Sequence, residues 1–113
     1  MTLDIAERIL AAIDTAVAGA PDLEAQSAAL RMRAVEYARV RADWMLAEPV
    51  VRARMDATRS GTHDRFILAC DDLASACAAQ ARDASWRKTL TSDRRTIGDF
   101  ACLVHALLGL WAR

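Results

Sequence analysis

The chain has 113 residues, enough for a single domain over residues 1–113 that buries its own hydrophobic core. Its 25 alanines and 12 leucines, against 4 glycines and 2 prolines, favour helix and predict an all-α protein. Fifteen basic residues balance 15 acidic ones, so the basic excess that is typical of general nucleic-acid binders is missing.

Two long helices are expected first. Apolar side chains recur at spacings of 3 and 4 over residues 3–18, and Gly19 and Pro21 end this helix. A second helix should begin at Pro21, because proline suits a first helical turn, and should continue to about residue 47, before Pro49 interrupts it. Its broad apolar stripe comprises Leu23, Leu30, Ala34, Tyr37, Ala38, Trp44 and Met45.

The middle of the chain is expected to contain a break. A short helix that carries Val51 and Met55 should follow the proline. The stretch RSGTHD at 59–64 should then form a loop, because Gly61 stops a helix. A further helix is then predicted over residues 63–87.

The last helix is expected over residues 93–112, with Ser92 as its N-cap. Leu103, Leu110 and Trp111 give it an apolar stripe wider than a small core requires. Taken together, these elements predict a compact bundle of four main helices plus one short helix.

The histidines and cysteines are the residues of this chain that could bind a transition metal. His63, Cys70 and Cys77 recur every seven residues, which is roughly 10.5 Å of helical rise, too far for one metal ion, and we interpret both cysteines as small core residues. Cys102 and His105 are three residues apart and remain weak metal candidates, because a metal site needs further ligands that the sequence does not indicate. No cofactor is expected.

No catalytic motif is present in the sequence. The chain lacks a phosphate-binding P-loop, a GxGxxG stretch and a GxSxG nucleophile turn. It also lacks the Glu-x-x-His pairs of di-iron bundles. We therefore expect a protein that is not an enzyme.

Arg41 is unusual because helical periodicity turns it toward the apolar stripe of the second helix. A buried charge without a partner is costly, so Arg41 should meet an acid from another helix or another chain, or lie at an interface. Arginine with tyrosine, tryptophan and methionine is a mixture enriched in protein interfaces. The interface candidates are therefore Arg41, Tyr37, Trp44, Met45, Leu103, Leu110 and Trp111.

Three Arg-x-Arg pairs, at 31/33, 39/41 and 52/54, could in principle form a surface for nucleic acid. Residues two apart on a helix diverge by roughly 200°, so these pairs do not form one continuous basic face. Nucleic acid is thus a possible partner but not the favoured one.

The stretch YARVRADWMLAEPVV, residues 37–51, resembles a helical segment of some phage small terminase subunits, over about an eighth of the chain. The resemblance implies a ring-forming, non-catalytic component of DNA packaging. A clear helix-turn-helix and a basic excess, which such a role favours, do not accompany it.

The N-terminal sequence MTLDIAERIL carries charges at positions 4, 7 and 8 and is unlike a signal peptide. The most apolar run, residues 100–111, is too short to span a bilayer. We expect a cytoplasmic protein with no membrane partner.

These observations favour a helical protein-interaction module, such as an adaptor, regulator or assembly subunit. It would act as a homo-oligomer or by binding to a larger complex. The alternative is a nucleic-acid-associated accessory protein of phage type, such as a small DNA-packaging subunit. A second alternative is a metal-binding helical bundle that uses Cys102 and His105.

Overall fold

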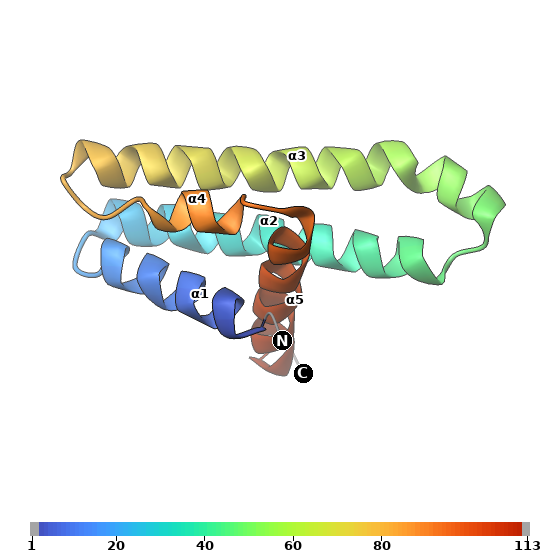
Figure 1. Ribbon diagram of the computed structural model, residues 1–113, viewed down its shortest axis with the longest axis horizontal. Coiled ribbons are helices and arrows are strands. Elements are labelled where there is room, and N and C mark those ends of the chain that lie inside the picture. Colours follow the sequence, from blue (N-terminus) through green and yellow to red (C-terminus); the bar gives the residue numbers. More distant parts are fainter. Residues whose placement is uncertain (1–2, 112–113) are drawn as a thin grey trace.

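The computed structural model describes residues 3–111 and the side chains of residues 4–108. Its helices are α1 (Leu3–Val17), α2 (Pro21–Leu46), α3 (Pro49–Ala79), α4 (Trp86–Leu90) and α5 (Arg94–Trp111) (Figure 1). No strand occurs in residues 3–111, so the predicted all-α bundle of four main helices plus one short helix is confirmed. None of the helices in this range combines the length and apolarity that crossing a bilayer requires.

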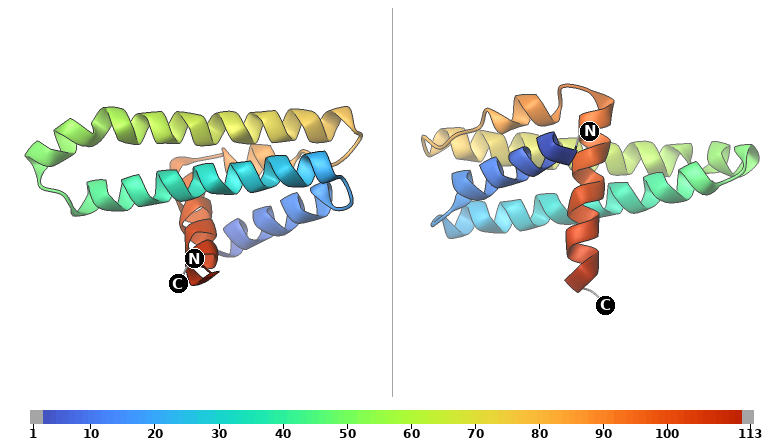
Figure 2. Two further views of the ribbon diagram at one scale, coloured as in Figure 1. Left: turned by 180° about the vertical axis from the view of Figure 1, so that it is seen from behind. Right: turned by 60° about the horizontal axis from the view of Figure 1, so that its bottom comes forward.

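Helices α2 and α3 run antiparallel as a long hairpin along the 47 Å axis of the molecule (Figure 1). Helix α1 packs beside the first half of α2, and the short α4 contacts both α1 and α3. Helix α5 crosses α2 steeply and also packs against α1 (Figure 2). Only one end of the hairpin is therefore covered by other helices.

The hydrophobic core lies at this covered end. Phe66 from α3 and Phe100 from α5 are fully buried, and their rings stack with centroids 5.9 Å apart. Cys70 and Cys77 are buried beside them, which confirms their prediction as core residues. Burial raises the pKa of the Cys70 thiol to about 12 and also raises the pKa of Cys77.

The other end of the hairpin projects beyond α1, α4 and α5 (Figure 1). From Arg39 to Gly61 no residue is buried, although both helices continue through this part of the chain. We call residues 39–61 the arm; its base, at Arg41 and Arg59, borders α5, and the remainder projects beyond it. Its helical structure is thus maintained without a hydrophobic core of its own.

The loop predicted at 59–64 is wrong, because α3 continues through this stretch as helix. Thr62 is buried, and its hydroxyl donates a hydrogen bond of 2.9 Å to the carbonyl of Arg59. A glycine inside a helix costs roughly 1 kcal/mol relative to alanine. Burial of Thr62 and Phe66 on the inner face of α3 outweighs that cost at Gly61. The predicted short helix after Pro49 is therefore the first part of α3.

Helix α3 ends at Ala79, eight residues earlier than predicted. Ala81 adopts the left-handed conformation, with φ of 57°. The amide of Arg82 donates to the carbonyl of Cys77 at 2.8 Å, and that of Ala81 donates to Ala78 at 3.0 Å. This pair of bonds is a Schellman helix end, formed here without the usual glycine. The one short helix, α4, follows this turn rather than Pro49.

The predicted cap of the last helix is also corrected. Asp93, not Ser92, accepts a hydrogen bond from the backbone N–H of Thr96, at 2.7 Å. This bond, together with the nearby charge of Arg95, lowers the pKa of Asp93. The hydroxyl of Ser92 donates instead to the carbonyl of Thr89.

Candidate functional site

The end of the arm carries four exposed apolar side chains, which we call the apolar tip. Met45, Leu46, Val50 and Val51 are between 43% and 88% exposed. They come from the last turn of α2 and the first turn of α3, on either side of a two-residue connection. Single exposed apolar residues are ordinary on protein surfaces, but four of them within the seven residues 45–51 favour an interaction surface.

Behind the tip, Trp44 joins the two helices of the arm. Its indole N–H donates to Asp56 on α3 at 3.0 Å. The guanidinium carbons of Arg52 and Arg59 lie 4.9 Å and 4.6 Å from the centre of the indole ring. Arg52 also donates hydrogen bonds to the carbonyls of Trp44 and Met45, at the end of α2. Cation–π contacts and charge-assisted hydrogen bonds therefore hold the arm together in place of a core.

Arg41 lies half-buried at the crossing of α2 and α5. Its Nη1 atom is 3.9 Å from the sulfur of Cys102, and a Cβ atom built on Gly98 would lie 3.3 Å from its guanidinium carbon. Among the residues with described side chains, no carboxylate reaches ion-pair distance of Arg41. In place of the acid expected from another helix, Arg41 contacts a sulfur atom and a glycine. Pairing with an acid from another chain stays a prediction.

Arg41 also lines a surface cavity of about 400 Å³ between α2, α3 and the start of α5. Three other arginines share this lining: Arg59 from α3, and Arg94 and Arg95 from the first turn of α5. We call it the arginine cavity. Its remaining walls are formed by Tyr37, Ser60, His63 and Ile97. No aspartate or glutamate lines it, so positive charges of three helices converge on one small volume.

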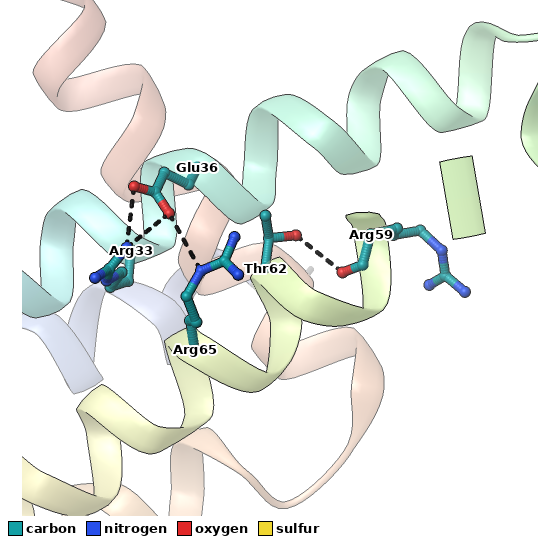
Figure 3. Close-up of polar contacts among 5 residues, drawn as sticks. All are labelled: Arg33, Glu36, Arg59, Thr62 and Arg65. Atoms are coloured by element: carbon teal, nitrogen blue, oxygen red, sulfur yellow. Dashed lines mark hydrogen bonds and ion pairs between the residues drawn. The ribbon is translucent and has the colours of Figure 1, made fainter. Parts of the chain in front are cut away.

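Five arginines outside the cavity are paired with a carboxylate. Glu36 accepts hydrogen bonds from Arg33 and lies 3.9 Å from Arg65, between the two side chains (Figure 3). Arg59 extends away from this carboxylate (Figure 3), and its Nε atom is buried with no hydrogen-bond partner among the described residues. Further arginines with a carboxylate partner are Arg8, Arg31 and Arg87. Within the described side chains, none of the four arginines of the cavity has such a partner.

The predicted interface residues fall into separate groups. Trp44 and Met45 meet at the arm, whereas Tyr37 is buried with its ring stacked on Phe66 at 6.1 Å. Leu103 is half-buried and packs against the core. The side chains of two further candidates, Leu110 and Trp111, lie outside the described residues.

The weak metal candidates Cys102 and His105 both lie on α5. Cys102 is exposed and contacts Arg41, while His105 is half-buried. Within the described part of the chain, no group of three or more histidine, cysteine or acidic side chains is placed to hold a metal ion.

Several residues of these two surfaces were missed by sequence reasoning. Leu46, Val50 and Val51 could have been found, because apolar residues flank Pro49 on both sides. Arg94 and Arg95 are adjacent at the start of a helix, but nothing in the sequence connects them with Arg59 or Arg41. Their convergence depends on how α5 crosses the hairpin.

The stretch at residues 37–51 covers the second half of α2, the connection and the start of α3. It therefore includes the apolar tip and two of the residues that line the arginine cavity, Tyr37 and Arg41. No family model, no curated protein and no solved structure matches the chain.

Proposed function

We propose that this protein is a non-enzymatic assembly module, in which the arm of one copy binds the covered end of a second copy. The apolar tip is the observation that carries this proposal. Leu46 is 88% exposed and Val50 67% exposed, although both belong to regular helices with apolar neighbours. Burying such side chains in a partner gains roughly 1.5–3 kcal/mol each.

Charge favours a contact between unlike regions of two copies. The arm contains five arginines and three carboxylates, a net charge of +2, so the remainder of this neutral chain carries −2. Two arms would repel one another, whereas an arm and the covered end attract. The opposite charges therefore support a head-to-tail arrangement.

The covered end offers a fitting acceptor. A cavity of about 370 Å³ between α1, α2 and α5 presents the apolar side chains of Val17, Met32 and Leu108. Asp14 and Glu24 line the same cavity. Its arginine, Arg31, is already paired with Asp14, which leaves the surroundings net acidic. An apolar tip flanked by arginines matches such a surface in both polarity and charge.

Head-to-tail contacts close into rings or extend as filaments, because each copy uses two different surfaces. Light scattering after size-exclusion chromatography tests this arrangement. We expect the wild type to assemble with increasing concentration, and both Leu46→Glu and Met32→Glu to be monomeric. Leu68→Glu is the matched control, since Leu68 is an exposed leucine of α3 outside both surfaces.

Mixing the two monomeric variants gives a sharper test. Leu46→Glu retains the acceptor cavity, and Met32→Glu retains the apolar tip. One copy of each can therefore pair, and the mixture should form dimers and nothing larger. A wild type that stays monomeric at several hundred micromolar would contradict the proposal. If Met32→Glu assembles like the wild type, the acceptor is wrong and the tip binds elsewhere.

A further inference from the structure

The arginine cavity concentrates positive charge in a protein whose net charge is zero. Arg41, Arg59, Arg94 and Arg95 line it, and no acid does. Like charges held close together repel one another unless a counter-charge lies between them. The arrangement therefore favours an anion inside the cavity.

Two carboxylates adjoin residues of this cavity in the sequence. Asp64 is 3.3 Å from the Nδ1 atom of His63, and Asp93 accepts the capping hydrogen bond from Thr96. Neither lines the cavity. The guanidinium groups of the four arginines thus keep most of their hydrogen-bond donors for a ligand.

The guanidinium geometry points to a phosphate ligand. Each guanidinium presents a planar fork of N–H donors that matches two oxygens of a phosphate group. A carboxylate carries one charge and is satisfied by one such fork, whereas a phosphate monoester carries about −1.5 to −2 at neutral pH. The positive charge of four guanidinium groups therefore matches the negative charge of about two phosphate groups.

The size and shape of the cavity favour a small molecule over a nucleic-acid strand. A volume of about 400 Å³ lies in the usual range of small-ligand sites. Nucleic-acid backbones are usually bound along an extended basic stripe. Here Arg33 and Arg65, which could have extended such a stripe, share Glu36 instead (Figure 3).

We propose that the arginine cavity binds a small phosphorylated ligand with two phosphate groups or one diphosphate. Arg41 and Arg59 hold it from α2 and α3, while Arg94 and Arg95 hold it from the start of α5. The guanidinium of Arg59 stacks on the ring of Trp44 and reaches the cavity from α3. Tyr37 and Ile97 provide the less polar wall, against which the carbon skeleton of such a ligand would lie.

Isothermal titration calorimetry with inorganic pyrophosphate tests this site, with sodium chloride used to keep the ionic strength constant. We expect one site per chain and weaker binding of orthophosphate. Arg94→Ala should weaken pyrophosphate binding by about tenfold or more, the loss expected for one charge-assisted contact. Arg94 is exposed at the start of α5, so its removal should leave the fold intact.

Arg39→Ala is the matched control. Arg39 is an exposed arginine of α2, two residues from Arg41, and does not line the cavity. Its removal should leave the affinity for pyrophosphate within about twofold of the wild type. Arg41→Lys keeps the charge but removes the fork, and should weaken binding nearly as much as Arg94→Ala.

Three results would overturn the proposal. The first is wild-type binding no stronger than that of chloride at matched ionic strength. The second is an equal loss in Arg39→Ala and Arg94→Ala, which would indicate a diffuse charge effect. The third is tighter binding of a duplex oligonucleotide than of pyrophosphate, which would favour nucleic acid. Leu46→Glu should bind pyrophosphate normally, so this site is tested separately from assembly.

Discussion

The two ends of the α2–α3 hairpin are stabilised in different ways. At the covered end, rings and aliphatic side chains pack between four helices, and Phe66 and Phe100 are entirely inaccessible to solvent. In the arm, the same two helices continue over residues 39–46 and 49–61 with no buried residue. Isolated helices of such length are marginal in water. The covered end thus depends on burial, whereas the arm depends on the contacts of Trp44 and on its continuity with the core.

The largest expected effect contrasts one large apolar residue from each end. Phe66→Ala should lower the free energy of unfolding by about 3–5 kcal/mol, because it leaves a cavity in a packed core. Leu46→Ala should change it by less than about 0.5 kcal/mol, since Leu46 packs against little in the monomer. Denaturant unfolding of dilute protein measures both. If the two variants lose similar amounts of unfolding free energy, the two ends of the hairpin are not stabilised in different ways.

A smaller loss is expected for Trp44→Ala, about 1–2 kcal/mol, because one hydrogen bond and two cation–π contacts disappear together. The effect should be local. Amide hydrogen exchange should accelerate over residues 39–61 and remain unchanged around Phe100. Met45→Ala, at the neighbouring exposed position, is the control and should leave the arm protected. Uniform loss of protection would show that the arm and the core unfold as one unit.

Ala81→Gly should stabilise the protein by about 0.5–1 kcal/mol. The left-handed conformation of Ala81 is unfavourable for a residue with a Cβ atom but not for glycine. The same substitution at Ala78, inside α3, should destabilise the protein by about 0.5–1 kcal/mol. Thermal unfolding of the two variants therefore gives shifts of opposite sign. Equal shifts would contradict the described end of α3.

The smallest effect concerns the cap of α5 at low pH. The folded-state pKa of Asp93 is lowered, so its ionised form contributes stability above its ordinary value of 3.8. That contribution is lost as the pH falls through the lowered pKa. Asp93→Asn retains an oxygen acceptor for the N–H of Thr96 but cannot ionise. The stability difference between wild type and variant should shrink as the pH falls from about 5 to 2, as unfolding at each pH would show.

Local periodicity was sufficient to predict α1, α2 and most of α5. Cys70 and Cys77 were also placed correctly, because a seven-residue spacing puts both on the inner face of one helix. The end of α3 was not predictable in this way, since the turn at Ala81 lacks the glycine that usually marks a Schellman end. At Gly61 the sequence predicted a helix end that does not occur, because tertiary packing overrides the weak helix propensity of glycine.

The candidate surfaces were predicted in part. Helical position alone identified Arg41 as an arginine turned toward apolar neighbours, and it does lie half-buried at a helix crossing. Its companions in the arginine cavity come from positions 59, 94 and 95, so their meeting depends on the angle at which α5 crosses the hairpin. The acid expected beside Arg41 could not be tested by periodicity, which gives the direction of a side chain but not its neighbour.

Gly98 has a consequence for how this protein can vary between species. Glycine within a helix is less favourable than alanine by roughly 0.5–1 kcal/mol, so its presence in α5 requires a reason. The guanidinium of Arg41 lies across it, 3.3 Å from an added Cβ atom, so a side chain at position 98 would push Arg41 aside by a few tenths of an ångström. Positions 41 and 98 should therefore covary in homologous sequences. Where residue 98 is larger than alanine, residue 41 should be shorter than arginine, and the two changes should arise together.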